Sequence, residues 1–123
     1  HGHEAGDHAL REVTRCTSKA IRDDDSLGRY GGEEFLIVLP DTDPGNAGIL
    51  AERLRMNIEA MSLEYGGKSI SVTASYGVHG VYMNDGKATV QSLSVGADEA
   101  VYQAKRNGRN CVVIRDRMIR RAA

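Results

Sequence analysis

The stretch that decides the fold is Arg29-Tyr30-Gly31-Gly32-Glu33-Glu34-Phe35, which runs directly into Leu36-Ile37-Val38-Leu39-Pro40. Two glycines between extended segments predict a two-residue β-hairpin turn, because such turns need positive φ at both central positions. Glu33 and Glu34 then stand at the head of an apolar strand, where neighbouring side chains point to opposite faces. One interpretation is a hairpin with a charged mouth. The other is a Mg²⁺ site that holds a phosphate, since Mg²⁺ prefers oxygen ligands and usually one or two protein carboxylates.

Length and composition describe one ordinary globular domain. The chain has 123 residues, 41% of them hydrophobic and 27% charged, with a formal net charge of −1. This charge balance gives no reason to expect nucleic-acid binding. Cys16 and Cys111 lack metal-type spacing and are typical of reduced thiols in a cytosolic protein. No apolar run has the length of a membrane span, so we expect a cytoplasmic domain, whose parent protein could still be membrane-anchored.

Periodicity along the chain predicts alternating helices and strands. Helices are expected at about 4–21, 44–61 and 90–107, and strands at 27–30, 33–39, 70–79, 81–83 and 111–114. Asp43 and Pro44 predict a helix start, Gly108 predicts a left-handed helix end, and a turn is expected at 84–86. This order predicts an α+β, ferredoxin-like βαββαβ domain that lacks its first strand.

Two further segments carry charged groups at helix ends. Gly2-His3-Glu4-Ala5-Gly6-Asp7 heads the first helix, and a longer block, Ala97-Asp98-Glu99-Ala100-Val101-Tyr102-Gln103-Ala104-Lys105-Arg106-Asn107-Gly108-Arg109-Asn110, closes the third. Taken alone, Asp7 at a helix N-terminus and Lys105 at a C-terminus are explained by the helix dipole.

With the heptapeptide, these segments make the chain resemble the GGDEF family, the bacterial diguanylate cyclases, in its Glu-for-Asp form. The resemblance implies a nucleotidyl-cyclase-like fold and a nucleotide site. By resemblance, Asp7 reads guanine, and a carboxylate can accept hydrogen bonds from N1–H and from the exocyclic amine of that base. The Gly31-Gly32 backbone would let the nucleotide approach, and Lys105 and Arg109 would hold its phosphates.

The resemblance also implies the reaction and its partners. Two GTP molecules would condense to c-di-GMP with release of pyrophosphate across a homodimer, under the control of an upstream sensory or receiver domain. Glu33 would be the catalytic carboxylate and the ligand of Mg²⁺ or Mn²⁺, and Glu34 would support the metal or the ribose. Metal ions neutralise phosphate charge in such in-line transfers.

A second ligand site is implied by Arg22, Asp25 and Arg53. An Arg-x-x-Asp segment is usually a surface ion pair of little energetic consequence. Five residues before the two glycines, it resembles the family's inhibitory site, where the product c-di-GMP docks, and Arg53 falls where the family supplies a second arginine. Guanidinium groups suit such a ligand because they grip phosphate with two hydrogen bonds and stack on guanine.

The chain departs from the family at its start. The family's first strand, which bears an aspartate metal ligand, and the lysine and asparagine that follow it are not within residues 1–123. We therefore expect residues 1–114 to form an incomplete domain followed by a basic tail at 115–123, and the chain as given to be inactive. Two alternatives stay open: a c-di-GMP receptor without catalysis, and a dimerisation module of the same fold.

Overall fold

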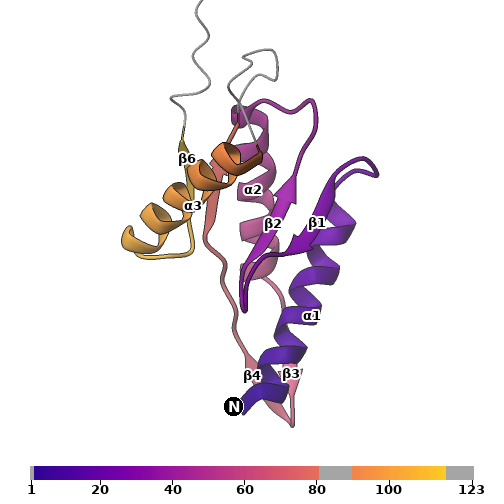
Figure 1. Ribbon diagram of the computed structural model, residues 1–123. Coiled ribbons are helices and arrows are strands. Elements are labelled where there is room, and N and C mark those ends of the chain that lie inside the picture. The colour runs from indigo at the N-terminus through magenta and orange to yellow at the C-terminus, as the bar shows by residue number, and fades with distance from the viewer. Residues whose placement is uncertain (1, 81–89, 116–123) are drawn as a thin grey trace, which may run out of the picture. The chain divides into compact units, whose positions relative to one another are not determined.

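The computed structural model describes residues 2–80 and 90–115, which group into two compact units (Figure 1). The first unit consists of His1–Asp41 and Met56–Val72, and the second of Thr42–Arg55 and Thr73–Ala123. The predicted strand at 81–83, the turn at 84–86 and the tail from 116 lie outside the described residues. None of the helices in the described part is long and apolar enough to cross a membrane.

Helix α1 (Gly2–Ala20) and the antiparallel hairpin of β1 (Ser26–Arg29) and β2 (Phe35–Val38) form most of the first unit. The predicted helix is confirmed, and Ala5 and Thr17 are its most buried residues. Arg29 pairs with Phe35 and Ser26 with Val38 in the hairpin register. Because Arg29 and Phe35 are the last pair, the five residues between them form the loop.

The predicted two-residue turn at Gly31-Gly32 is therefore wrong. The amide of Tyr30 donates to the carbonyl of Glu34 at 2.8 Å, which closes a five-residue loop. Within the described residues, neither Gly31 nor Gly32 has positive φ. Gly31 instead gives room to Glu34, since a Cβ on Gly31 would lie 3.1 Å from its Oε1. Glu33 and Glu34 belong to this loop and not to the strand, so the argument from alternating strand faces is wrong as well.

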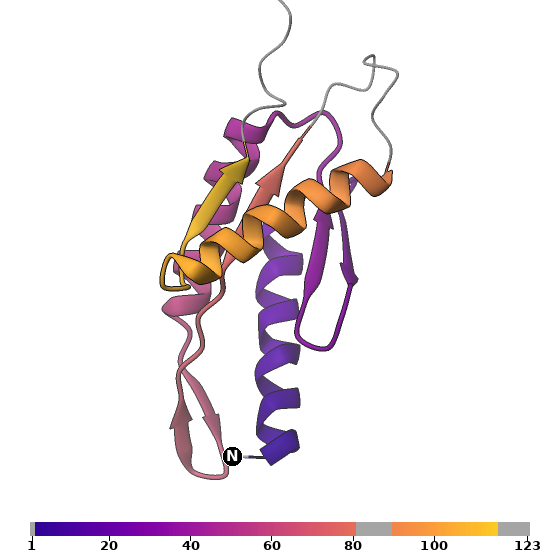
Figure 2. The same cartoon turned by 60° about the vertical axis from the view of Figure 1, so that its left-hand side comes forward.

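The two-residue glycine turn occurs later in the chain. Strands β3 (Leu63–Tyr65) and β4 (Lys68–Ile70) pair antiparallel, and Gly66 and Gly67 join them with φ of 61° and 79° (Figure 2). Positive φ at both positions is the requirement for this kind of hairpin. The hairpin also shortens the predicted strand 70–79, because β4 ends at Ile70 and residues 71–75 pair with no strand in the described ranges.

The second unit is a helix laid on two parallel strands. Strand β5 (Tyr76–His79) pairs with β6 (Val112–Arg115) in parallel, and α3 (Val90–Arg106) packs on β5. Glycines allow this close packing: a Cβ on Gly77 would overlap backbone atoms of α3, and one on Gly96 would overlap the His79 ring. Ala100 and Ala104 are buried on the same helix.

Helix α2 (Pro44–Glu59) begins in the second unit. The predicted cap is confirmed, because Oδ1 of Asp43 accepts a 2.8 Å hydrogen bond from the amide of Asn46. Among the described residues, Leu54 and Ile58 are the largest fully buried side chains. The predicted left-handed helix end is confirmed too, since Gly108 after α3 has φ of 109°.

Candidate functional site

The first unit contains an open cavity of about 620 Å³ between α1 and the β1–β2 hairpin. Helix α1 contributes residues at steps of three or four positions, and the hairpin contributes residues of both strands. The lining consists of Asp7, Leu10, Arg11, Thr14, Ser18, Leu27, Gly28, Arg29 and Phe35. Apolar side chains with a few charged ones are what a planar, hydrogen-bonding ligand such as a nucleobase needs.

Asp7 lies at the N-terminal end of this cavity. Asp7 is exposed. Arg11 follows it by one helical turn, so both charged residues lie on the cavity side of α1. A carboxylate here can accept hydrogen bonds from two N–H groups of a base. The sequence did not point to Arg11; its i+4 spacing from Asp7 is the signal that could have found it.

Arg29 holds the glycine loop. Its Nε donates to the carbonyl of Gly31 at 3.3 Å, and its Nη2 donates to the carbonyl of Gly32. The same residue lines the cavity, so it joins the cavity to the loop that carries the two glutamates. The sequence pattern assigns Arg29 no role of its own. Its position directly before the loop is the available signal, because a long side chain there can turn back onto the loop carbonyls.

Glu33 and Glu34 are both exposed on the loop. Within residues 2–80 and 90–115, no group of three or more His, Cys, Asp or Glu side chains could hold a metal ion. The loop carboxylates nevertheless suit Mg²⁺ as part of a shell, because this ion usually takes one or two carboxylates and completes its coordination with substrate phosphates and water. The donor set thus fits a metal that arrives with a nucleotide.

Lys105 and Arg109 belong to the second unit, at the last turn of α3 and in the turn after it. Both residues are exposed. Arg109 has φ of 66°, a left-handed conformation that is uncommon outside glycine. These two cations therefore stand at a helix end whose carbonyls already favour positive charge.

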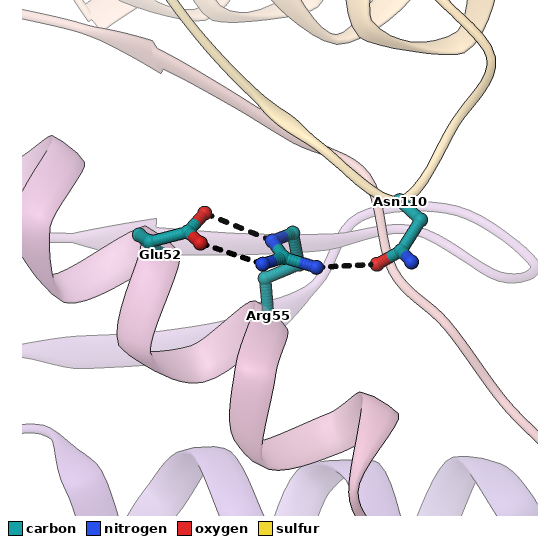
Figure 3. Close-up of polar contacts among 3 residues, drawn as sticks. All are labelled: Glu52, Arg55 and Asn110. Carbon is teal, nitrogen blue, oxygen red and sulfur yellow. Dashed lines mark hydrogen bonds and ion pairs between the residues drawn. The ribbon is translucent and has the colours of Figure 1, made fainter.

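A polar network that the sequence did not point to supports this turn (Figure 3). Arg55 donates to both carboxylate oxygens of Glu52, at 2.8 and 2.6 Å, and to Oδ1 of Asn110 at 3.0 Å. The hydrogen bond from Arg55 is the main cause that lowers the pKa of Glu52. The i,i+3 spacing of Glu52 and Arg55 is a local signal, but the contact with Asn110 spans 55 residues and has none.

Arg22 and Asp25 meet in the first unit, as the Arg-x-x-Asp spacing suggested. Oδ2 of Asp25 accepts a 2.8 Å hydrogen bond from the amide of Arg22 and lies 3.6 Å from its Nε. The Asp25 side chain is 1% exposed, whereas that of Arg22 is 62% exposed. Oδ1 of Asp25 is buried and has no hydrogen-bond partner in the part of the chain that the structure describes.

The candidate residues divide between the two units. The first unit holds Asp7, Gly31, Gly32, Glu33, Glu34, Arg22 and Asp25, and the second holds Arg53, Lys105 and Arg109. Arg53 is exposed on α2. The structure thus places Asp7 at a cavity bounded by the hairpin and Arg22 against Asp25. Lys105 and Arg109 both lie in the second unit.

Comparison with known proteins gives a consistent answer. Residues 1–111 match the family described as "Diguanylate cyclase, GGDEF domain". Diguanylate cyclase A of Treponema denticola is 41% identical over 114 residues, which are 93% of this chain and 30% of that protein. This chain therefore spans less than a third of the length of that relative.

Solved structures are similar as well. The diguanylate cyclase SiaD of Pseudomonas aeruginosa, solved with its activator SiaC, superposes with a TM-score of 0.84 at 38% identity, over 92% of this chain and 42% of that one. The active GGEEF domain of a diguanylate cyclase from Vibrio cholerae has a TM-score of 0.79 at 34% identity, over 92% of this chain and 70% of that one. The expected α+β cyclase-like fold is confirmed.

Proposed function

Because the chain belongs to the GGDEF family of diguanylate cyclase domains, we propose that residues 1–114 are part of a catalytic domain that makes c-di-GMP from two GTP molecules. The observation that carries this proposal is the family match over residues 1–111 together with the Gly31–Glu34 loop, which follows the cavity-lining residue Arg29. The Vibrio cholerae domain, described as active, has the same Glu-containing signature. A glutamate at position 33 is therefore compatible with catalysis.

In this proposal each domain holds one GTP. The base enters the cavity, where Asp7 accepts hydrogen bonds from guanine, and the phosphates extend toward the glycine loop. Arg29 keeps the carbonyls of Gly31 and Gly32 engaged, so that the loop is shaped before substrate arrives. Lys105 and Arg109 neutralise phosphate charge that would otherwise resist attack by an oxygen nucleophile.

The chemistry is an in-line displacement at phosphorus. The 3′-hydroxyl oxygen of one GTP forms a bond to the α-phosphorus of the other, the bond to the β-phosphate bridging oxygen breaks, and pyrophosphate leaves. Glu33 accepts the proton of the hydroxyl, and Glu34 supports the ribose end. Repeating the step on the second pair of groups closes the ring, so two GTP give one c-di-GMP and two pyrophosphates.

Mg²⁺ or Mn²⁺ is the metal that this loop would hold, through Glu33 with Glu34 beside it. Bound there with the triphosphate, a divalent ion supplies Lewis-acid stabilisation of phosphate charge. The exposed carboxylates of the loop match the oxygen ligands that these ions prefer.

A homodimer follows from this half-site chemistry. One domain binds one GTP, so the two reacting nucleotides need two domains that face each other. Activity then depends on whatever brings two chains together, and an upstream sensory or receiver domain is the proposed source of that control.

We propose a product site at Arg22 and Asp25, with Arg53 as a further residue that contacts c-di-GMP. Oδ2 of the buried Asp25 side chain accepts a hydrogen bond from the Arg22 amide, which holds the start of the Arg-x-x-Asp segment in place. The exposed Arg22 guanidinium suits a phosphate. Calorimetric titration of c-di-GMP should show weaker binding to Arg22→Ala; equal affinity would reject this site.

The proposed product site also supports a second function, namely a c-di-GMP receptor that catalyses nothing. A receptor and an enzyme differ in turnover, not in product binding. The test is to incubate the parent protein with GTP and Mg²⁺ and to measure c-di-GMP and pyrophosphate. Formation of both, in a ratio of about one to two as the displacement requires, supports the enzyme, whereas product binding without turnover supports the receptor.

Asp7 provides the substrate-specific arm of that test. Asp7→Ala should raise the KM for GTP about tenfold or more, because the hydrogen bonds to guanine are lost. The loss should be smaller for ITP, which lacks the exocyclic amine. If GTP and ITP were affected equally, Asp7 would not read the exocyclic amine of guanine.

A further inference from the structure

The turn after α3 has an unusual backbone. Gly108, Arg109 and Asn110 have φ of 109°, 66° and 50°, so three successive residues are left-handed. Glycine adopts this conformation easily, whereas side chains with a Cβ resist it. Such a conformation persists only where the surrounding structure holds it. The contacts of the turn therefore show what keeps Arg109 in place.

The side chain of Asn110 is held by helix α2. In Figure 3 the Arg55 guanidinium lies between the Glu52 carboxylate and the Asn110 amide. Two hydrogen bonds fix it to Glu52, at 2.8 and 2.6 Å, and a third reaches Oδ1 of Asn110 at 3.0 Å. The Arg55 side chain is 16% exposed. A two-point pair of this kind fixes the direction in which the third N–H group points.

The main chain of the turn is held separately. The amide of Asn110 donates to Oγ of Ser75 at 3.0 Å, and the amide of Arg109 donates to the carbonyl of Ala104 at 3.0 Å. Asn110 is thus fixed through both its backbone and its side chain. Arg109, directly before it, keeps an exposed side chain on a constrained backbone.

We propose that Arg55 is a positioning residue for Arg109, and this inference rests on the proposed function of Arg109 in binding the GTP phosphates. Glu52 orients Arg55, Arg55 holds Asn110, and Asn110 keeps the turn in the conformation that presents the Arg109 guanidinium. A cation whose backbone is fixed in advance loses less freedom when it meets a triphosphate. Arg55 itself touches no nucleotide.

Arg55→Lys is the main variant, because lysine keeps the charge but lacks the planar fork that donates to both oxygens of Glu52 and to Asn110. Its matched control is Arg15→Lys, which alters another i,i+3 Arg–Glu pair, with Glu12, far from the turn in sequence. In the dimeric parent protein, Arg55→Lys should weaken a non-hydrolysable GTP analogue about tenfold and leave guanosine affinity unchanged. Arg15→Lys should change neither.

Coupling separates positioning from general stability. If Arg55 acts through Arg109, then Arg55→Lys should cost no further affinity in an Arg109→Ala background. The proposal would be overturned if the affinity losses of Arg55→Lys and Arg109→Ala multiplied in the double variant. It would also be overturned if Arg55→Lys weakened guanosine and the GTP analogue equally. Unchanged analogue affinity in Arg109→Ala would remove the proposed phosphate role of Arg109, and this proposal with it. Guanosine binding and turnover would still test the remainder of the proposed function.

A second pair of variants covers the case in which Arg55→Lys fails to fold. Asn110→Gly permits the left-handed backbone but removes the acceptor for Arg55, whereas Asn110→Asp retains an oxygen there. We expect Asn110→Gly to weaken the GTP analogue like Arg55→Lys, and Asn110→Asp to bind it more tightly than Asn110→Gly. Equal affinity of all three proteins, including the parent, would overturn the proposal.

Discussion

The phenol hydroxyl of Tyr65 on β3 donates a 3.0 Å hydrogen bond to Oε1 of Glu4 in the first turn of α1. The Tyr65 ring also lies against His8, with ring centroids 5.7 Å apart. Figures 1 and 2 both show the β3–β4 hairpin beside the N-terminal end of α1, within the first unit. The β3–β4 hairpin therefore stabilises the turns of α1 that carry Asp7.

Tyr65→Phe tests this stabilisation, because it keeps the ring and removes only the hydroxyl. We expect the melting temperature of the protein to fall by about 2 °C at neutral pH, since the lost hydrogen bond is exposed. Differential scanning calorimetry of both proteins measures it. A variant as stable as the parent would show that the hydrogen bond contributes nothing.

The same pair of proteins carries a pH dependence. The hydrogen bond to Glu4 raises the pKa of Tyr65. A raised pKa means that the folded protein holds this proton more tightly, so the stabilisation is full below the ordinary tyrosine value of about 10 and is lost as pH rises through the higher folded value. The stability gap between parent and Tyr65→Phe should therefore narrow above pH 10. A constant gap would contradict the assignment.

Gly77→Ala tests the close packing of α3 on β5. The new Cβ would overlap the backbone amide of Val101 and the carbonyl of Ala97, so the helix must shift, at a cost of about 1–3 kcal/mol in unfolding free energy. Gly6→Ala is the matched control, because its Cβ would meet nothing within 4 Å on α1. There alanine should stabilise by about 0.5–1 kcal/mol. Urea unfolding should give opposite signs; two equal changes would refute the packing argument.

The two glycine pairs can be told apart in the same assay. Gly66 needs its positive φ of 61°, so Gly66→Ala should cost about 1–2 kcal/mol, and Gly66→Asn should cost less. A Cβ on Gly32 would meet nothing within 4 Å, so Gly32→Ala should stay within about 0.5 kcal/mol of the parent. A larger loss of unfolding free energy for Gly32→Ala than for Gly66→Ala would instead support a tight two-residue turn at Gly31-Gly32.

These glycines also show which structural features local sequence rules can predict. Local rules predicted the Asp43 cap and the left-handed Gly108, because each depends on a few neighbouring residues. They misassigned Gly31-Gly32, since a backbone hydrogen bond from Tyr30 to Glu34 made the loop longer. A glycine pair alone does not reveal which of two loops will be tight.

Long-range partners lay beyond the sequence for a different reason. The strand expected at 70–79 is shorter because a strand forms only where a neighbour supplies hydrogen bonds, and that neighbour is set by the tertiary fold. Likewise, nothing near Arg55 indicates that its partner is Asn110, 55 residues away. The motif residues could be named from the sequence, but the side chains that hold them could not.

The central claim is that the Glu33 carboxylate serves catalysis while the loop folds without it. Its most direct measurement is the initial rate of c-di-GMP formation from GTP and Mg²⁺ by the parent protein, Glu33→Gln and the control Glu64→Gln, which alters an exposed carboxylate on β3. We predict that Glu33→Gln lowers the rate at least about a hundredfold without changing the melting temperature, and that Glu64→Gln matches the parent. Turnover near the parent rate in Glu33→Gln would contradict the account.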